Sequence, residues 1–469
     1  MKPRSMGALA AASALALTGC SHYARYEARP LDPAAAGAAF EGRSLSDPGL
    51  RQFLERNGRT PAAWPLPSWH FEDLCWAAFY YNPSLGVARA QWAAARAGID
   101  VAAARPNPTV SLLPDYATHV APGISPWLSG LNFDIPVTTA GKRGHQIESE
   151  KQNTESARQA VFAGAWQVRA QLQGALIDLD AARRRLGAIQ RQAEAQREAT
   201  RLLQARQAAG SIGAQELAVS RLALSRAEAA LGDAKRQVPL QLQQVAQAVG
   251  LPASSLGDVQ LPVPHPADIS SEDLAAARRE ALLNRPDVLG ALARYEGTQA
   301  SLALEVARQY PDLHLGPGYQ YDQGQNDWTL GLTFELPVFQ HNQAGIAQAE
   351  ANRAEAAAEF TALQANVIGE IEGAAATAAA SRAQAASLAE LQAGLKGQAA
   401  LVDQRRQQGG ADALDVQNSR LEVIAGELGL IDARALAAHD ACRLEDALQV
   451  PLPSLTNVLS GGPAASSSP

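Results

Sequence analysis

Residues 128–144 read LSGLNFDIPVTTAGKRG, and residues 329–345 read TLGLTFELPVFQHNQAG, which is the same pattern 201 positions later. In both stretches apolar residues alternate with polar or small ones up to a proline, as in a strand with one apolar face. A long run without proline, rich in Ala, Gln, Arg and Leu, follows each stretch. The chain therefore contains two copies of one unit, in which a pair of short strands leads into a very long helix.

Landmarks on both sides of these stretches keep nearly the same spacing. Five pairs lie 200 to 203 residues apart: Pro83 and Pro286, Pro108 and Pro311, Gly144 and Gly345, Gly210 and Gly410, Leu251 and Leu452. A period of this length excludes the small solenoid repeats. Because no Ser/Gly-rich or charged linker separates the halves, we expect two intertwined repeats rather than two domains.

The pattern sets the boundaries of these repeats. We expect a first repeat at 71–253 and a second at 271–453, preceded by an extended segment at 20–70 and followed by a disordered tail at 454–469. The first repeat is predicted to hold strands 109–116 and 128–137 and a helical hairpin 145–249. The second is predicted to hold strands 312–321 and 328–338 and a hairpin 343–448.

Composition favours long packed helices. Aromatic residues make up only 5% of the 469 residues, and much of the 47% hydrophobic fraction is alanine. A formal net charge of -7 provides no basic face, so nucleic acid is excluded as a partner.

The first twenty residues indicate export. Lys2 and Arg4 precede an apolar run that is too short to span a bilayer, and Leu17-Thr18-Gly19-Cys20 ends it with small residues. This ending resembles the lipobox of bacterial lipoproteins, which implies a signal peptide at 1–19, acylation of Cys20 and, with Ser21 next, transport to the outer membrane. An ordinary signal peptide with an incidental cysteine is the alternative.

Two cysteines remain, Cys75 and Cys442, each at an outer end of the helical region of its repeat. An oxidising periplasm would allow a disulfide between them. Two buried free thiols are the alternative, because unpaired cysteine is among the most buried residue types.

The strands are candidates for membrane spans. Each is about ten residues long, which suffices for a tilted strand to cross a bilayer. Tyr319, Tyr321 and Trp328 cluster at the turn end of the second hairpin, as interfacial aromatic residues do. A soluble hairpin is the alternative. Four strands cannot close a barrel, and open edges are not tolerated in lipid, so several copies must share one barrel.

The long helices show coiled-coil spacing and then break. Apolar positions alternate by four and three through Val161, Ala165, Val168, Leu172, Ala175 and Leu179, and more loosely through Phe360, Leu363, Val367 and Ile371. Breaks follow at Gly210 and Gly409, and an acid lies six residues beyond each, Glu216 and Asp415. In a threefold assembly these acids would form carboxylate rings that favour cations. Stabilisation of a helix N-terminus is the alternative role.

Taken together, the lipobox, the duplicated units, the proline-containing second strands and the breaks followed by an acid resemble outer membrane efflux proteins of the TolC type. The duplication and the stretch from Gly409 to Arg420 are the most specific features. Gly141-Lys142-Arg143-Gly144 looks like the branch that serves heavy-metal cation exporters.

The resemblance implies a mainly α fold with a small transmembrane β part. It implies a homotrimer with a twelve-stranded β-barrel in the outer membrane that continues into a twelve-helix periplasmic barrel. The helix tips would dock a periplasmic adaptor (membrane fusion) protein coupled to an inner-membrane RND-type transporter. Small and apolar tip residues that we expect to be exposed for this contact are Gly210, Ile212, Leu217, Gly409, Gly410 and Leu414.

No catalytic motif is present. The sequence lacks a P-loop, a nucleophile elbow, a Cys-x-x-Cys pair and a His-Glu-x-x-His motif, and its eight histidines are scattered. We therefore expect no enzyme, no cofactor and no metal site. Passive export across the outer membrane is the leading function, and a non-conducting coiled-coil lipoprotein that braces the periplasm is the alternative. The exported substrate stays open between metal cations and drugs, with the Gly-Lys-Arg stretch favouring cations.

Overall fold

The computed structural model describes residues 24–257, 259–263, 271–322 and 324–449. The predicted signal peptide, Cys20 and the tail at 454–469 lie outside the described residues. The chain divides into two compact units, Met1–Arg43 and Ser44–Pro469. In the first unit the described part contains helix α2 (Pro33–Glu41).

The segment at 20–70 is not simply extended, as the sequence pattern had indicated. It contains α2 and, in the second unit, α3 (Pro48–Arg56). Asp32 accepts a hydrogen bond from the Ala34 N–H at 2.9 Å, and Asp47 accepts one from the Gly49 N–H at 2.7 Å. Both helices thus begin with an Asp cap followed by proline, a local start signal that outweighs the lack of periodicity in so short a helix.

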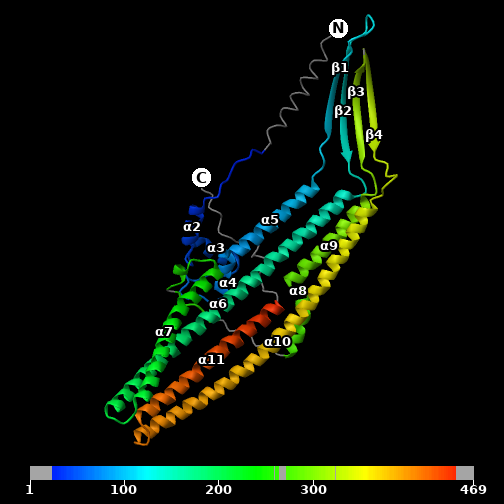
Figure 1. The fold of residues 1–469 in the computed structure, drawn as a ribbon. Helices are drawn as coiled ribbons and strands as arrows, with labels where there is room; N and C mark the ends of the chain where they lie inside the picture. The colour runs from blue at the N-terminus through cyan, green and yellow to red at the C-terminus, as the bar shows by residue number, and fades with distance from the viewer. Residues whose placement is uncertain (1–23, 258, 264–270, 323, 450–469) are drawn as a thin grey trace. The chain divides into compact units, whose positions relative to one another are not determined.

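Two long helices dominate the second unit (Figure 1). In the first repeat α6 (Lys142–Ala208) is followed by α7 (Ala214–Val249), and in the second α10 (Gln343–Gln407) is followed by α11 (Ala413–Leu448). The 67 residues of α6 span about 100 Å. The predicted apolar positions from Val161 to Leu179 are buried, which confirms the coiled-coil spacing.

Shorter helices lie beside the long ones. They are α4 (Phe71–Tyr81), α5 (Pro83–Ala103), the 3-10 turn η2 (Ala253–Leu256), α8 (Ser271–Asn284) and α9 (Pro286–Ala307). On the sheet side the helices lie in the order α5, α6, α9, α10, and on the side of the hairpin tips in the order α7, α6, α11, α10 (Figure 1). The long helix α6 therefore packs against α5 and α9 on the sheet side and against the returning helices α7 and α11 on the tip side. The long helix α10 packs against α9 on the sheet side and against α11 on the tip side.

A four-stranded antiparallel sheet extends from one end of these helices. Its strands β1 (Thr109–Tyr116), β2 (Trp127–Val137), β3 (Leu313–Asp322) and β4 (Gln325–Phe334) pair in chain order. Tyr116 lies opposite Trp127 and Tyr319 opposite Trp328, with ring centroids 4.9 and 5.0 Å apart. The two hairpins therefore share one register, and the first has the same aromatic pair that the sequence suggested only in the second.

The register sorts the side chains into two faces. One face is almost entirely apolar or aromatic: Val110, Leu112, Tyr116, Trp127, Leu131, Phe133, Ile135, Leu313, Leu315, Tyr319, Trp328, Leu330, Leu332 and Phe334. The opposite face carries Ser, Thr, Asn, Gly, His314 and the aspartates 115, 134, 322 and 327, together with Leu113 and Leu128. The one-sided pattern expected from the sequence is thus present across all four strands.

The last strand differs from the prediction. The sequence indicated 328–338, whereas β4 covers Gln325–Phe334. At its start Gln325 and Asn326 already pair with β3, so the turn is tighter than expected. At its end the Val338 N–H donates to the Leu336 carbonyl at 2.8 Å, a tight turn around Pro337. The equivalent Ile135–Val137 stay in β2 because β3 pairs with them.

Candidate functional site

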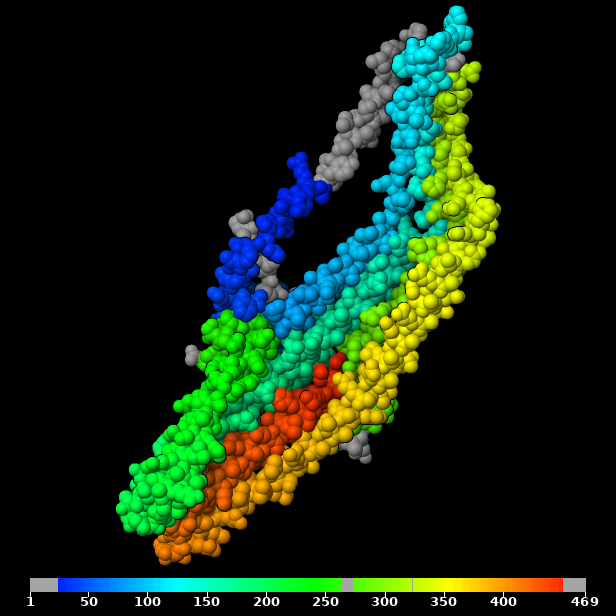
Figure 2. Space-filling model, in the orientation of Figure 1, coloured from blue at the N-terminus to red at the C-terminus, as the bar shows by residue number. Residues whose placement is uncertain are grey.

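The two hairpin tips have the same backbone geometry. Gly210 and Gly409 both adopt a left-handed conformation, with φ of 74° and 77°. Immediately after them the Ser211 N–H donates to the Arg206 carbonyl at 2.9 Å and the Gly410 N–H to the Arg405 carbonyl at 2.8 Å. This is how helices end on glycine. Figure 2 shows the two tips beside each other at the end of the second unit.

The predicted acids follow these turns. Glu216 is exposed in the first turn of α7. The Asp415 carboxylate accepts the Asp412 N–H at 2.9 Å, while the Asp412 carboxylate accepts the N–H groups of Leu414 and Asp415 at 2.6 and 2.9 Å. Asp415 thus completes a capping box, and the helix-stabilising role that the sequence left open applies to it.

Asp412 also joins the two hairpins at their tips. Its carboxylate forms an ion pair with Arg206, near the end of α6. The Asp415 N–H and the Arg206 guanidinium together lower the pKa of Asp412. The sequence pattern did not predict this contact, although Asp412-x-x-Asp415 at the start of a helix is a recognisable capping signal.

The apolar tip residues are only partly available for docking. Gly210, Gly409 and Gly410 are exposed, and Ile212 and Leu414 are half-buried. Leu217 is buried, with 3% of its surface exposed, so its predicted exposure is wrong. It lies one turn before Ser220, whose hydroxyl contacts that of Thr200 on α6 at 2.8 Å, and therefore faces into the hairpin.

A groove of about 630 Å³ lies between α6, α10 and α11 on the tip side of the helices. Its small and apolar residues are Ala195, Ala399, Ala400, Val423 and Ile424, and its charged residues are Arg191, Glu194, Glu198, Lys396, Asp403, Arg420 and Glu427. Such a surface combines an apolar floor with charges of both signs. It suits another helix with a complementary charge pattern.

Ion pairs connect α6 and α11 along their length. From the tips upward the pairs are Arg206–Asp412, Arg191–Glu427 at 2.7 Å, Arg185–Asp432 and Arg169–Glu445 at 2.5 Å. Between the last two, the His439 ring contacts the Asp178 carboxylate at 2.8 Å. Most of these side chains are half-exposed, so each pair contributes only about 0.2–1 kcal/mol. These pairs and the buried apolar contact of Ala188 with Ile424 and Ile431 together join the two helical hairpins.

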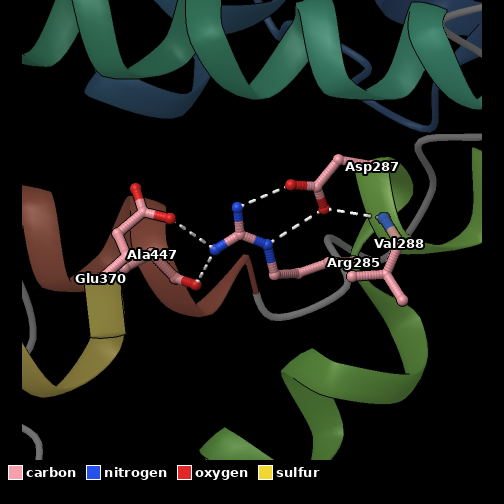
Figure 3. Close-up of polar contacts among 5 residues, drawn as sticks. All are labelled: Arg285, Asp287, Val288, Glu370 and Ala447. Carbon is pink, nitrogen blue, oxygen red and sulfur yellow. Dashed lines mark hydrogen bonds and ion pairs between the residues drawn. The ribbon is translucent and has the colours of Figure 1, made fainter. Parts of the chain in front are cut away.

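The returning helices α7 and α11, which run from the tips back toward the sheet, each end at a polar side chain that donates a hydrogen bond to a carbonyl of the last turn. We call these two side chains, Asn82 and Arg285, the anchors. Asn82 precedes Pro83, and its side-chain amide donates to the Ala248 carbonyl in the last turn of α7 at 2.9 Å. Arg285 precedes Pro286 at the equivalent place, and its guanidinium donates to the Ala447 carbonyl of α11 at 2.5 Å (Figure 3). It also binds Asp287 at 2.8 Å and Glu370 at 3.1 Å.

Cys75 and Cys442 are free and buried in the structure, which therefore contradicts the disulfide alternative and agrees with two free thiols. Burial raises the pKa of both thiols to about 12. Thiols with so high a pKa are almost entirely protonated at neutral pH and react slowly.

Among the described residues there is no group of three or more His, Cys, Asp or Glu placed to hold a metal ion. Within the same part of the chain, no helix is both long and apolar enough to cross a membrane.

A sequence model of the family described as "Outer membrane efflux protein" matches residues 78–251 and 277–448. The chain is 25% identical over 268 residues to the cobalt-zinc-cadmium resistance protein CzcC of Cupriavidus metallidurans. That match covers 56% of this chain and 62% of the length of that relative.

Solved structures share the fold. A membrane protein from Pseudomonas aeruginosa has a TM-score of 0.67 at 20% identity, over 92% of this chain and 97% of that one. The outer membrane protein VceC of Vibrio cholerae has a TM-score of 0.66 at 20% identity, over 81% and 95% of the two chains. CusC, described in the context of transmembrane channel formation, has a TM-score of 0.64 at 18% identity, over 92% and 99%.

Proposed function

This chain belongs to the outer membrane efflux protein family, and from that premise we propose that it forms the outer membrane exit duct of a tripartite efflux pump. Substrates would enter from a periplasmic adaptor and an inner-membrane RND-type transporter, and pass outward without a chemical step. The energy would come from the inner-membrane partner. We expect the protein to lie in the outer membrane and extend into the periplasm.

One observation carries the proposal: the sheet has an apolar face, a polar face rich in small residues, and two outer strands whose outer edges pair with no other strand of the described chain. Such a sheet fits lipid on one side and a water-filled bore on the other. Because four strands cannot seal themselves, we propose a homotrimer that shares a barrel of twelve strands.

The tips and the groove would receive the adaptor. Exposed Gly210, Gly409 and Gly410 allow close approach of another helical tip, and the groove offers an apolar floor with charged rims. Leu414 and Ile212 would add apolar contact from their half-buried positions. We expect Leu414→Asp to weaken adaptor capture in a pull-down, while Leu391→Asp, an exposed leucine outside the groove lining, leaves it unchanged. Equal capture by both variants would contradict tip docking.

Threefold symmetry would place Glu216 and Asp415 in rings at the periplasmic mouth. Such rings attract cations. The carboxylates within a ring repel one another unless they are protonated or bridged by a cation. The capping role of Asp415 is compatible with this, because a helix N-terminus favours an acidic residue whether or not that residue also lines a pore.

Cations are the favoured cargo. The four strands carry Asp115, Asp134, Asp322 and Asp327 on the polar face and contain no lysine or arginine. A bore lined in this way raises the local concentration of cations. The name of the CzcC relative, which refers to cobalt, zinc and cadmium resistance, points to the same class of substrate.

Acylation of Cys20 would anchor the mature N-terminus in the outer membrane. Mass spectrometry of the mature N-terminus tests this directly. Two or three fatty acyl chains on Cys20 are the expected result, and an unmodified cysteine or a different cleavage site would contradict it.

Reconstitution into planar bilayers tests the duct itself. The expected result is stepwise conductance that favours K⁺ over Cl⁻, with selectivity reduced in a variant in which all four strand aspartates are changed to asparagine. Folded trimers that never conduct would instead support the alternative function, a structural lipoprotein that braces the periplasm.

A further inference from the structure

Three glycines leave part of the backbone bare on the polar face of the sheet. Gly316 of β3 lies opposite Gly331 of β4, and Gly318 lies two residues further along β3. We call these three residues the glycine patch. Glycine weakens the interior of a strand, and there it often marks a place where a ligand approaches the backbone closely.

The first repeat shows that the fold does not require this patch. First strands correspond at a spacing of 203 and second strands at 201, so Gly316 corresponds to Leu113 and Gly331 to Gly130. Leu113 and Gly130 also lie opposite each other. A Cβ added at Gly130 would lie 3.8 Å from the Leu113 Cβ. The same position therefore holds a large side chain in one repeat and none in the other.

Two side-chain oxygens converge over one end of the glycine patch. Gly318 lies opposite Asn132 of β2 on one side and opposite Thr329 of β4 on the other. A Cβ added at Gly318 would lie against the Asn132 side-chain oxygen and 2.6 Å from the Thr329 hydroxyl oxygen. Both residues are exposed, so their oxygens can accept hydrogen bonds from the water shell of a ligand.

A histidine held by a carboxylate borders the other end. His314 lies two residues from Gly316 on β3, and its Nδ1 is 2.9 and 3.1 Å from the two Asp134 carboxylate oxygens. An ionised carboxylate only accepts hydrogen bonds, so Nδ1 carries the proton and the lone pair of the neutral imidazole is on Nε2. Metal-binding histidines have this arrangement, in which the second ring nitrogen donates to a carboxylate. The His314 side chain is 44% exposed, so solvent reaches the ring.

The charge of the surroundings favours a cation. Asp134 is one of four aspartates on the polar face, and the four strands contain no lysine or arginine. Lys142, which follows β2, forms an ion pair with Asp312 at 2.8 Å. A cation on this face therefore meets fixed negative charge and no positive side chain of the strands.

We propose that the glycine patch and its border form a weak station for a divalent transition-metal cation on the wall of the bore, an inference that rests on the proposed function. His314 supplies Nε2 as a ligand, and Asp134 positions the ring. Asn132 and Thr329 accept hydrogen bonds from water on the ion. Because His314 and Gly318 are about 13 Å apart along β3, the ion keeps part of its water shell.

The donor set decides both the class of ion and the strength of binding. Imidazole suits zinc and similar ions, whereas Ca²⁺ and Mg²⁺ prefer oxygen ligands alone. Among the described residues no third His, Cys, Asp or Glu is placed to complete a tight metal centre. Weak binding suits a conduit, since an ion must be able to leave each site that it enters.

Chemical modification tests the station at the level of single histidines. Diethyl pyrocarbonate acylates the free nitrogen of an accessible histidine, and peptide mass spectrometry of the assembled protein in detergent gives the rate at each one. We expect Zn²⁺ to slow modification of His314 severalfold, at concentrations that leave the exposed His119 between β1 and β2 unchanged. Ca²⁺ at the same concentrations should protect neither residue.

Two variants disturb the station and keep the histidine. Asp134→Asn removes the carboxylate, and we expect it to raise the Zn²⁺ concentration for half-protection about tenfold or more. Gly316→Leu introduces the residue of the first repeat and should weaken protection severalfold, because its side chain covers the glycine patch. Asp115→Asn removes one aspartate at the far end of the same face and should leave protection unchanged.

The outcomes separate the station from the duct. Failure of Zn²⁺ to protect His314, or equal protection of His314 and His119, would overturn the station. So would unchanged protection in both Asp134→Asn and Gly316→Leu, and using two variants guards against one failing to fold. Conductance without Zn²⁺ protection rejects the station alone, whereas selective protection in folded trimers that never conduct supports the station and rejects the duct.

Discussion

The two anchors of the returning helices do the same work with different chemistry. In the first repeat Asn82 is 7% exposed and donates one amide hydrogen bond to α7, beside a large core with Trp76, Tyr80 and Tyr81. In the second repeat Arg285 is 5% exposed and donates to α11 while it binds two carboxylates, beside a much smaller core.

The difference shows what the fold requires at this place. Both side chains aim a donor at the last turn of a returning helix, where its C-terminus meets the N-terminus of α5 or α9. The fold therefore constrains the acceptor carbonyl and the following proline, and leaves the donor free to change. Where less apolar surface is buried, a charged donor with more partners has replaced a neutral one.

Removing Arg285 should have the largest effect. Arg285→Met leaves the Ala447 carbonyl without its donor and Asp287 and Glu370 without their cation, which we expect to cost about 3 kcal/mol in free energy of unfolding. Thermal unfolding in detergent, followed by circular dichroism, measures this. Arg308→Met is the control, because Arg308 is half-exposed and pairs with Glu305 on its own helix; equal shifts would contradict the anchor role.

The second largest loss of stability is expected when a methyl group is added at Gly250. Gly250 has a φ of 88°, and a Cβ there would lie 2.6 Å from the Tyr81 carbonyl oxygen. We expect Gly250→Ala to lower the unfolding free energy by about 2–3 kcal/mol, since strain and a backbone clash add. Gly213→Ala, with open space around it, is the control and should change little. Similar melting temperatures for the two variants would refute the close approach.

Asn82 has two roles that can be separated. Its side-chain oxygen accepts the Ser84 N–H at 2.9 Å, and its amide donates to α7. Asn82→Ala loses both and should cost about 2 kcal/mol. Asn82→Asp keeps the cap but loses the donor. We therefore expect it to lower the free energy of unfolding by about half to three quarters as much as Asn82→Ala, measured by the same unfolding assay. An unchanged Asn82→Asp variant would show that the bond to Ala248 contributes nothing.

Asp446 makes the second anchor sensitive to pH. One of its carboxylate oxygens is buried without a hydrogen-bond partner in the part of the chain that the structure describes. Burial, then Glu370, raises its pKa to about 6, with Glu445 acting in the same direction and Arg285 and Arg169 opposing. The ionised group therefore destabilises the fold above pH 6, and this penalty fades as pH falls through 6 towards 4.

We accordingly expect Asp446→Asn to stabilise the protein by about 1 kcal/mol at pH 8, after discounting for its partial exposure, and to have little effect at pH 4. Melting curves across this range measure it, with Asp233→Asn on the exposed face of α7 as the control. A shift of the same size at both pH values would exclude titration of Asp446 as the cause.

The smallest expected effect is an increase in the free energy of unfolding. Gln449 ends α11 with a φ of 41°, where the first repeat uses Gly250. Gln449→Gly removes the left-handed strain of a side chain and should stabilise the protein by about 0.5–1 kcal/mol. A decrease in melting temperature would mean that the Gln449 side chain contributes more than the strain costs.

Much of the architecture follows from local pattern and spacing. The duplication predicted both hairpin tips, since Gly210 and Gly409 adopt the same left-handed turn. Period-2 alternation predicted the two faces of the sheet, because one register fixes every side chain. The end of β4 differs because a strand needs a partner: β3 pairs with Ile135–Val137, whereas no strand of the described chain pairs with the equivalent residues 336–338.

The candidate site was harder to predict. Asn82 and Arg285 contact carbonyls 166 and 162 residues away, and nothing local distinguishes them from ordinary residues before proline. Arg206 and Asp412 are likewise 206 residues apart, so the sequence could show only the capping box and not the ion pair across the tips. The prediction for Leu217 failed because closeness to a glycine turn does not say which face of the helix a residue occupies.

The order of the helices has a mechanical consequence. Among the described helices, α6 and α10 run without interruption from the tips to the sheet, whereas the line of α7 and α5 and that of α11 and α9 are each broken at an anchor. Bending of the helical part is therefore resisted along its length by the two continuous rods α6 and α10. At the level of Asn82 and Arg285 the broken lines depend instead on side-chain hydrogen bonds and on the apolar cores packed beside them.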